Sequence, residues 1–140
     1  SGIVCRDFKM KLLRLGFIVS YEEDPHVRLS SMSSLNEEDV VIAFSYSGET
    51  SNIVKTAQYA LTRNAKVISV TQIGKNALQK VSDFVIHIPI EEQELRFGAI
   101  TSRSSSLIIT DLLYLCLAQS DLGNTKEKLV MSRAMVNQIF

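Results

Sequence analysis

Three apolar runs along the chain have the length and composition of buried β-strands. They cover residues 40–44, 66–71 and 83–88, and each is rich in β-branched or aromatic side chains. Between them, residues 50–62 have helical periodicity and residues 77–81 predict a short helix. The apolar face of the longer segment consists of Ile53, Val54, Ala57, Ala60 and Leu61. Strands that alternate with helices predict a parallel sheet that is covered by helices on both faces.

The N-terminal part of the chain predicts two helices and one further strand. Residues 3–15 form an amphipathic helix that Gly16 ends. Its apolar face consists of Val4, Phe8, Leu12 and Leu15. Residues 17–21 are β-branched and aromatic and predict a strand, and residues 27–35 predict a short helix. The side chains expected to point inward from that helix are Val27, Met32 and Leu35.

The C-terminal third predicts two more helices. A long helix runs from about Gly98 to Ser120 and is apolar nearly all round after Leu107. Such a helix is buried on several sides, so we expect it to form part of the interface of a homodimer or higher homo-oligomer. A last amphipathic helix covers residues 124–140. Its apolar stripe consists of Leu129, Val136 and Phe140.

The loop after the first of the three apolar runs carries the candidate chemistry. Hydroxyl groups gather there around Gly48, from Ser45, Ser47, Thr50 and Ser51. The next helix begins in this loop, and the first turn of a helix stabilises an anion through unpaired N–H groups and partial positive charge. One hydroxyl could simply cap the helix, whereas several around a single glycine indicate a small phosphate site. The P-loop and dinucleotide-binding motifs are missing, so a small phosphate ester fits better than ATP or NAD.

Composition and charge narrow the class of protein. The chain has 140 residues, the length of one domain, with 46% hydrophobic and 21% charged residues, as in soluble globular proteins. Its 15 basic and 15 acidic residues balance, so no overall charge attracts nucleic acid or an anionic membrane. Cys5 and Cys116 lack CxxC spacing and indicate plain thiols in a reducing cytoplasm. The longest apolar stretch, residues 107–118, is too short to span a bilayer.

Two motifs closely resemble the sugar isomerase (SIS) domain of RpiR-type transcriptional regulators. The first is Phe44-Ser45-Tyr46-Ser47-Gly48-Glu49-Thr50, followed by a helix and the strand at residues 65–71. In the family this Ser-x-Ser-Gly-x-Thr loop holds a sugar phosphate. The second motif runs from Leu95 to Arg103, with Asp111 and Leu112 further along. RpiR-type proteins join an N-terminal helix-turn-helix domain to a C-terminal SIS domain that senses a phosphosugar.

The resemblance implies a fold and a domain organisation. We expect a single SIS domain over residues 1–140, an α/β fold in which a parallel, flavodoxin-like sheet is the middle of a three-layer αβα sandwich. The family's domain opens with a central strand, beside the strand at residues 40–44, and a Gly-x-Gly-Ser-Ser-type loop. This chain begins with Ser1-Gly2, which resembles the end of that loop. We therefore expect a domain without its first strand and without the helix-turn-helix domain, through which alone it would contact DNA.

The resemblance also implies a ligand-sensing regulatory domain that needs neither cofactor nor metal. The residues expected to bind the phosphosugar are Ser1, His26, Ser45, Ser47, Gly48 and Thr50. His26 follows the predicted strand at residues 17–21, and the carboxyl ends of parallel strands face the ligand crevice. From its sequence position alone, His26 is as easily a surface residue as a ligand.

Two other functions compete with sensing. An active phosphosugar isomerase needs a positioned base that moves a proton between adjacent sugar carbons. The candidate bases are His26, Glu49, His87 and Glu94. A purely structural dimerisation module would use the loop hydroxyls only as caps, and the complete set of Ser45, Ser47 and Thr50 argues against it. Carboxylates and histidines near a crevice are common, so spacing assigns no catalytic pair, and the sensor leads on resemblance.

Overall fold

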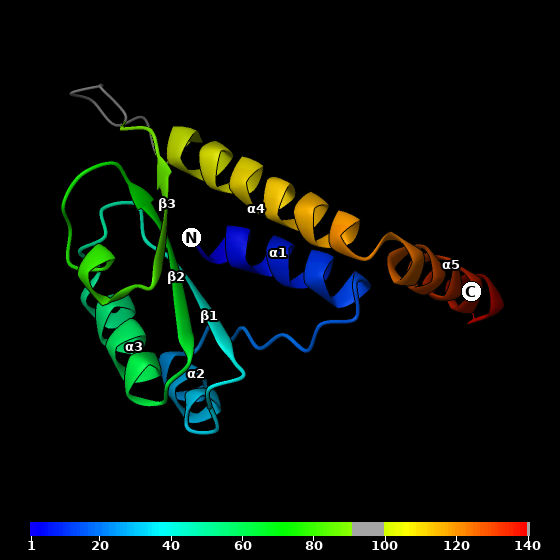
Figure 1. Ribbon diagram of the computed structural model, residues 1–140, viewed down its shortest axis with the longest axis horizontal. Helices are drawn as coiled ribbons and strands as arrows, with labels where there is room; N and C mark the ends of the chain where they lie inside the picture. The colour runs from blue at the N-terminus through cyan, green and yellow to red at the C-terminus, as the bar shows by residue number, and fades with distance from the viewer. Residues whose placement is uncertain (91–99, 140) are drawn as a thin grey trace. The chain divides into compact units, whose positions relative to one another are not determined.

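The chain forms two compact units in the computed structural model, which describes residues 1–90 and 100–139 (Figure 1). The first unit consists of Ser1 and the described part of Glu22–Ser106. The second consists of Gly2–Tyr21 and the chain from Leu107 onward. Each unit is held together by its own internal contacts.

The first unit is built on a parallel sheet. Its strands, as far as the described residues go, are β1 (Val40–Phe44), β2 (Lys66–Gln72) and β3 (Phe84–Ile88), in the order β1-β2-β3 (Figure 1). Val41 lies opposite Val67 in the first pairing, and Val70 lies opposite Ile86 in the second. The three strands predicted from the apolar runs and their parallel arrangement are confirmed. Because parallel strands point the same way, their carboxyl ends share one edge of the sheet.

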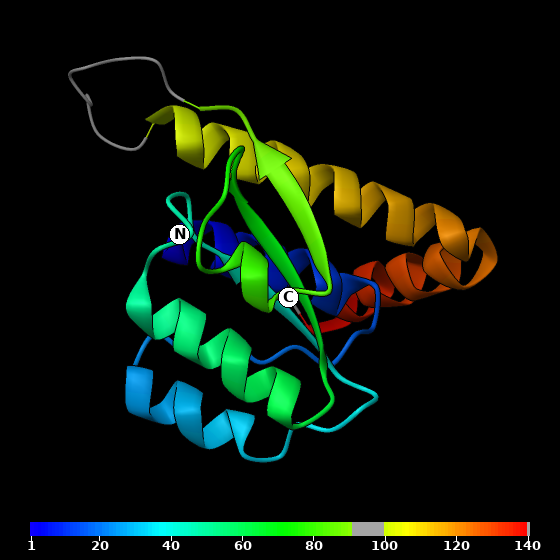
Figure 2. The same ribbon diagram turned by 60° about the vertical axis from the view of Figure 1, so that its left-hand side comes forward.

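Two helices of the first unit share a core with the sheet. They are α2 (Pro25–Met32) and α3 (Ser51–Thr62), which lie side by side and begin at the same end (Figure 2). The core consists of Met32, Ala43, Ala57, Ala60, Ala65, Val67 and Leu78. Val67 and Leu78 are fully buried, and burial of each contributes about 1.5–3 kcal/mol. The predicted α/β class, a parallel sheet flanked by helices, is confirmed.

Several sequence expectations fail in detail. Residues 17–21 form no strand and pair with none of β1, β2 or β3, and Ile18 is fully exposed. An apolar run becomes a strand only where another strand satisfies its backbone N–H and C=O groups. Val27 is 51% exposed, because it lies about 140° around α2 from the buried Met32 and cannot share its face. Leu61 is also exposed, at the edge of the α3 stripe, and residues 77–81 form only a 3₁₀ turn, η1 (Gln79–Val81).

The second unit is helical. It contains α1 (Gly2–Arg14), the part of α4 (Ile100–Ser120) from Leu107 onward, and α5 (Leu122–Ile139). Lys128 of α5 donates from Nζ to the carbonyl oxygen of Leu15 at 3.0 Å, which satisfies an acceptor just past the end of α1. Gly16 has φ +82°, as expected for a residue that ends a helix. The predicted start of α4 at Gly98 and the predicted stripe residue Phe140 lie outside the described residues.

Lys11 joins two helices of the second unit through ion pairs. Its Nζ donates to Asp7 of α1 at 2.5 Å and also to Asp111 of α4. Burial lowers the pKa of Lys11, but the hydrogen bonds and charges of Asp111 and Asp7 outweigh this effect, and the net pKa is raised.

No single helix among the described residues has the length and apolar character to cross a membrane. Helices α4 and α5 meet the criteria of length and composition only as a pair, and this pair is bent by 108°.

Asp83 anchors the start of β3 to β2. Its carboxylate accepts the N–H of Val67 at 2.8 Å and lies 3.4 Å from the ammonium of Lys66. Its own N–H donates to the carbonyl oxygen of Val67 at 2.8 Å. The hydrogen bond from Val67, which outweighs a desolvation effect of opposite sign, lowers the pKa of Asp83, and the charge of Lys66 adds to the decrease.

This lowered pKa predicts a pH-dependent stability. The unfolded chain takes up a proton at a higher pH than the folded chain, so the contribution of Asp83 is present above the unfolded pKa of about 3.9 and is lost as pH falls through the folded pKa. Urea unfolding from pH 7 to pH 3 should show that Asp83→Asn has the lower midpoint at pH 7. The difference from wild type should close toward pH 3. A difference that is constant over this range would contradict the assignment.

Candidate phosphate-binding site

The candidate site begins where β1 ends, in the ligand loop (residues 45–50). Ser45 is buried, and its N–H donates to the carbonyl oxygen of Val70 at 3.1 Å, which ties the loop to β2. The N–H of Gly48 then donates back to the carbonyl oxygen of Ser45 at 3.1 Å and closes a tight turn. Gly48 has φ +68°, a conformation that favours glycine over any residue with a Cβ atom. The turn delivers the chain directly into α3.

The loop hydroxyls bond within the loop instead of capping α3. Thr50 is the N-cap residue of α3, yet its side chain makes no capping hydrogen bond. Its Oγ1 lies 3.0 Å from Oγ of Ser45, and Oγ of Ser47 accepts the N–H of Glu49 at 3.2 Å. The explanation of Thr50 as a plain helix cap is therefore wrong. Thr50, Ser47 and Ser45 belong to one hydroxyl-lined turn.

The first turn of α3 presents unsatisfied backbone donors. Within the part of the chain that the structure describes, the N–H groups of Thr50, Ser51 and Asn52 have no hydrogen-bond acceptor. The next amides, those of Ile53 and Val54, already donate to the carbonyl oxygen of Thr50. Ser51 and Asn52 are exposed, so a ligand can reach these amides. Unpaired amides at the positive end of a helix dipole are a site for an anion.

A second loop is bonded to the ligand loop. This β2–η1 loop (residues 73–78) donates from the Leu78 N–H to the carbonyl oxygen of Gly48, and from the Ala77 N–H to Oε1 of Glu49, both at 2.9 Å. Asn76 is 5% exposed and lies so close to Gly48 that a Cβ atom there would be 2.2 Å from its Cγ. The sequence pattern suggested Glu49 only as a base and indicated no role for Asn76. The one sequence signal for Asn76 was its position after the carboxyl end of β2.

The structure places the other predicted ligands without showing their contacts. His26 lies in the first turn of α2, not after a strand as expected, and Asp24 caps that helix by accepting the N–H of His26 at 2.8 Å. His26 is exposed. The first turn of α2 lies at the end of the unit where α3 also begins (Figure 2). Ser1 is exposed and belongs to the same unit as the ligand loop. A ligand role for His26 and for Ser1 stays a prediction.

Two of the candidate bases of an isomerase contact backbone groups. The carboxylate of Glu49 accepts a backbone N–H, and Nδ1 of His87 lies 3.3 Å from the carbonyl oxygen of Gln72. Glu94 lies outside the described residues. Across residues 1–90 and 100–139, no group of three or more His, Cys, Asp or Glu could hold a metal ion.

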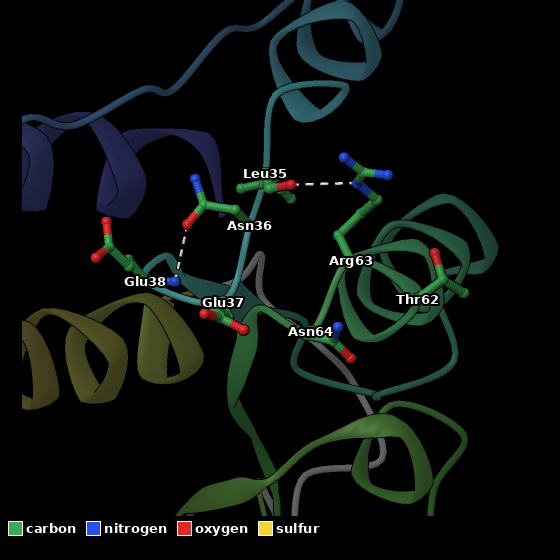
Figure 3. A pocket seen from close by; sticks show the side chains of 7 residues that line it. All are labelled: Leu35, Asn36, Glu37, Glu38, Thr62, Arg63 and Asn64. Atoms are coloured by element: carbon green, nitrogen blue, oxygen red, sulfur yellow. Dashed lines mark hydrogen bonds between the residues drawn. The ribbon is translucent and has the colours of Figure 1, made fainter.

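A cavity of the first unit lies away from the ligand loop. It has a volume of about 410 Å³ and is lined by the loop before β1 and the end of α3 (Figure 3). Arg63 there donates from Nε to the carbonyl oxygen of Leu35 at 3.1 Å. The lining also includes the carboxylates of Glu37 and Glu38, which repel an anion. A phosphate site therefore fits the ligand loop and not this cavity.

Comparison with known proteins identifies the family. The SIS domain family matches residues 1–116, so the chain belongs to this family. An uncharacterised HTH-type transcriptional regulator of Caldanaerobacter subterraneus is 34% identical over an alignment of 140 positions, which covers 95% of this chain and 50% of the relative. The chain thus spans about half the length of that curated relative.

Solved structures have the same fold. The Vibrio vulnificus NanR protein, complexed with ManNAc-6P, matches 99% of this chain and 52% of its own at 27% identity and a TM-score of 0.87. The sugar isomerase domain of an RpiR transcription factor from Sphaerobacter thermophilus matches 96% of this chain and 73% of its own at 14% identity, with a TM-score of 0.77. Methanococcus jannaschii MJ1247, for which a 3-hexulose-6-phosphate isomerase function was inferred, matches 94% and 70% at 22% identity and a TM-score of 0.71. The last two matches show the fold alone.

The contact between Gly48 and Asn76 predicts the effect of adding one methyl group. Gly48→Ala forces an L-residue into positive φ, at about 1–2 kcal/mol, and pushes against a buried, hydrogen-bonded side chain. We expect a loss of at least about 2 kcal/mol in unfolding free energy, measured with urea.

Gly123→Ala is the matched control, since nothing lies within 4 Å of the added Cβ in helix α5. It should raise the stability by up to about 1 kcal/mol, the difference in helix propensity. Equal stability of Gly48→Ala and wild type would show that Asn76 does not hold the ligand loop.

Proposed function

We propose that this chain is the phosphosugar-sensing effector domain of an RpiR-type transcriptional regulator. The observation that carries the proposal is the set of unpaired N–H groups of Thr50, Ser51 and Asn52 at the start of α3, beside the hydroxyls of Ser45 and Ser47. A phosphoryl group has three oxygens that accept hydrogen bonds, and these donors match it. The complex of the similar NanR structure with ManNAc-6P supports a sugar phosphate as the ligand.

The regulator is favoured over the isomerase because of the curated relative and the state of the candidate bases. The relative is an HTH-type regulator, and the carboxylate of Glu49 is bonded to a backbone N–H in place of facing the loop hydroxyls as a free base. A cytoplasmic location and DNA contact through a separate helix-turn-helix domain belong to the same proposal. His26, at the start of α2, and Ser1 complete the proposed ligand set.

Loss of the loop hydroxyls should weaken the binding of phosphorylated sugars selectively. A hydrogen bond to a charged group contributes about 1.5–3 kcal/mol, so the double variant Ser47→Ala/Thr50→Ala should lower affinity for ManNAc-6P at least about 10-fold. Calorimetric titration with ManNAc-6P and with unphosphorylated ManNAc measures this. The weak binding of the unphosphorylated sugar should change little.

Ser33→Ala/Ser34→Ala is the matched control, since both residues follow α2 and their hydroxyls donate to carbonyl oxygens in its last turn. Equal loss for both sugars in the loop variant would refute a phosphate role. A thermal-shift screen of hexose, amino sugar and N-acetylated sugar phosphates extends the test if ManNAc-6P does not bind, because a ligand of the native state raises apparent stability. Turnover of any of them would identify an isomerase.

His26→Ala tests the role of His26. The affinity of wild type and of this variant for ManNAc-6P is measured at pH 6 and pH 8, because an imidazolium binds phosphate better than a neutral imidazole. If the variant has the same affinity as wild type, His26 does not belong to the site.

We also propose that α4 forms a homodimer or higher homo-oligomer interface. Its apolar side chains face more directions than one neighbour covers: Ile108 is 58% exposed, Leu112 53% and Leu115 51%. Exposed apolar side chains that cluster on one helix mark an interaction surface.

Leu112→Glu should therefore shift the chain to monomer, since the interface would bury an unpaired carboxylate. Light scattering measures the mass of the wild-type chain and the variant. Gln119→Glu, the same charge at an exposed polar position of α4, is the control and should leave the mass unchanged. A wild-type chain that is monomeric at high concentration contradicts the proposal.

A further inference from the structure

The ligand loop and the β2–η1 loop are joined by two backbone donors that reach across 28 and more residues of sequence. The Ala77 N–H donates to Oε1 of Glu49, and the Leu78 N–H donates to the carbonyl oxygen of Gly48. One acceptor lies at the tight turn, and the other lies on the residue that precedes the N-cap Thr50. Both acceptors therefore lie immediately before residues 50–52, which supply the unpaired amides.

The side chain of Asn76 adds hydrogen bonds to this connection between the two loops. Its Nδ2 donates to Oγ1 of Thr71 at 3.1 Å, and Oγ1 of Thr71 donates to the carbonyl oxygen of Tyr46 in the ligand loop at 3.2 Å. Its Oδ1 accepts the N–H of Gln79 at 2.9 Å, so it also fixes the start of η1. Asn76 thus contacts Gly48 and links three segments: β2, the ligand loop and η1.

The rest of the β2–η1 loop has little to hold it. Ile73 is 55% exposed, Gly74 has φ +122° with nothing within 4 Å of an added Cβ, and Lys75 is exposed. A loop with exposed residues and few buried contacts opens at low free-energy cost. The Ile73 N–H donates to the carbonyl oxygen of Ile88 at 3.1 Å. Beyond Ile73, the order of the loop depends on the bonds to Gly48 and Glu49 and on the buried side chains of Asn76 and Leu78.

We propose that occupancy of the phosphate site and closure of the β2–η1 loop are coupled, with Glu49 and Asn76 as the positioning residues. The inference rests on the proposed function and deepens it, because it names the segment that responds to the ligand. A phosphate bound to the amides of residues 50–52 fixes the ligand loop, and with it the acceptors that hold Ala77 and Leu78. By linkage, the factor by which phosphate favours the closed loop equals the factor by which the closed loop favours phosphate.

Glu49 allows its two contributions to be separated. Its Oε1 holds the β2–η1 loop, while its negative charge lies next to a site for an anion and opposes binding. Glu49→Gln keeps an oxygen acceptor and removes the charge, whereas Glu49→Ala removes both. A residue that only stabilised the fold would not give different phosphate affinities in these two variants, which both lack the charge.

The experiment measures phosphate affinity and amide exchange in the same proteins. Inorganic phosphate and ManNAc-6P are titrated into wild type, Glu49→Gln, Glu49→Ala and Asn76→Ala, and NMR hydrogen exchange of Ala77 and Leu78 is recorded with and without saturating ligand. The Asp39 amide, which donates to the carbonyl oxygen of Asn36 before β1, reports general stabilisation. Glu38 is an exposed carboxylate in the loop before β1, and Glu38→Ala is the control for Glu49→Ala.

We expect ligand to slow exchange of Ala77 and Leu78 about 5-fold or more beyond any change at Asp39. Glu49→Gln should bind at least as tightly as wild type. Glu49→Ala should bind more weakly than Glu49→Gln, and Asn76→Ala more weakly than wild type, each by up to the same factor. If neither probe nor any sugar phosphate of the thermal-shift screen binds wild type, the proposed function fails and this inference fails with it. If a probe binds but Ala77 and Leu78 change no more than Asp39, or Glu49→Gln and Glu49→Ala bind alike, the coupling alone is overturned. Glu49 is exposed, so its variants keep the test valid even if Asn76→Ala does not fold.

Discussion

The tight turn at Gly48 is the constraint on which the candidate site depends. It reverses the chain within the ligand loop, so that β1 ends and α3 begins a few residues apart. The hydroxyl of Thr50 bonds to Ser45 across this turn and is thereby kept from capping α3. Helix N-termini normally satisfy some of their amides with a capping side chain. Here the first-turn amides remain available to a ligand.

Recognition at this site rests on the backbone more than on charged side chains. Within the described segments, no Lys or Arg forms a hydrogen bond or an ion pair with the side chains of Ser45, Ser47, Glu49 or Thr50. Glu49 is the one charged residue in the sequence of the loop. An anion is then held by oriented N–H groups and the helix dipole, which cost no side-chain ordering on binding. Discrimination between sugars has to come from residues outside the loop.

The sequence predicted the elements whose signals are local. β1, β2 and β3 are short runs of β-branched and apolar residues, α3 has a clear stripe, and the hydroxyl-rich ligand loop is contiguous in sequence. The segment 17–21 failed because a strand needs a partner, which its own composition cannot report. Asn76 was missed for a related reason, since its contact with Gly48 joins residues that only the pairing of β1 with β2 brings together. Local patterns therefore gave the ligand loop but not the residues that hold it.

The placement of Glu49 connects the structure to the choice between catalysis and sensing. A general base must reach the substrate carbon with a free lone pair and a pKa suited to proton transfer. One carboxylate oxygen of Glu49 instead accepts the N–H of Ala77, and this hydrogen bond fixes the β2–η1 loop. Movement of this side chain toward a substrate would break that bond and release the β2–η1 loop. In the proposed coupling, this bond carries the state of the phosphate site to an adjacent segment, which is what the proposed effector domain requires.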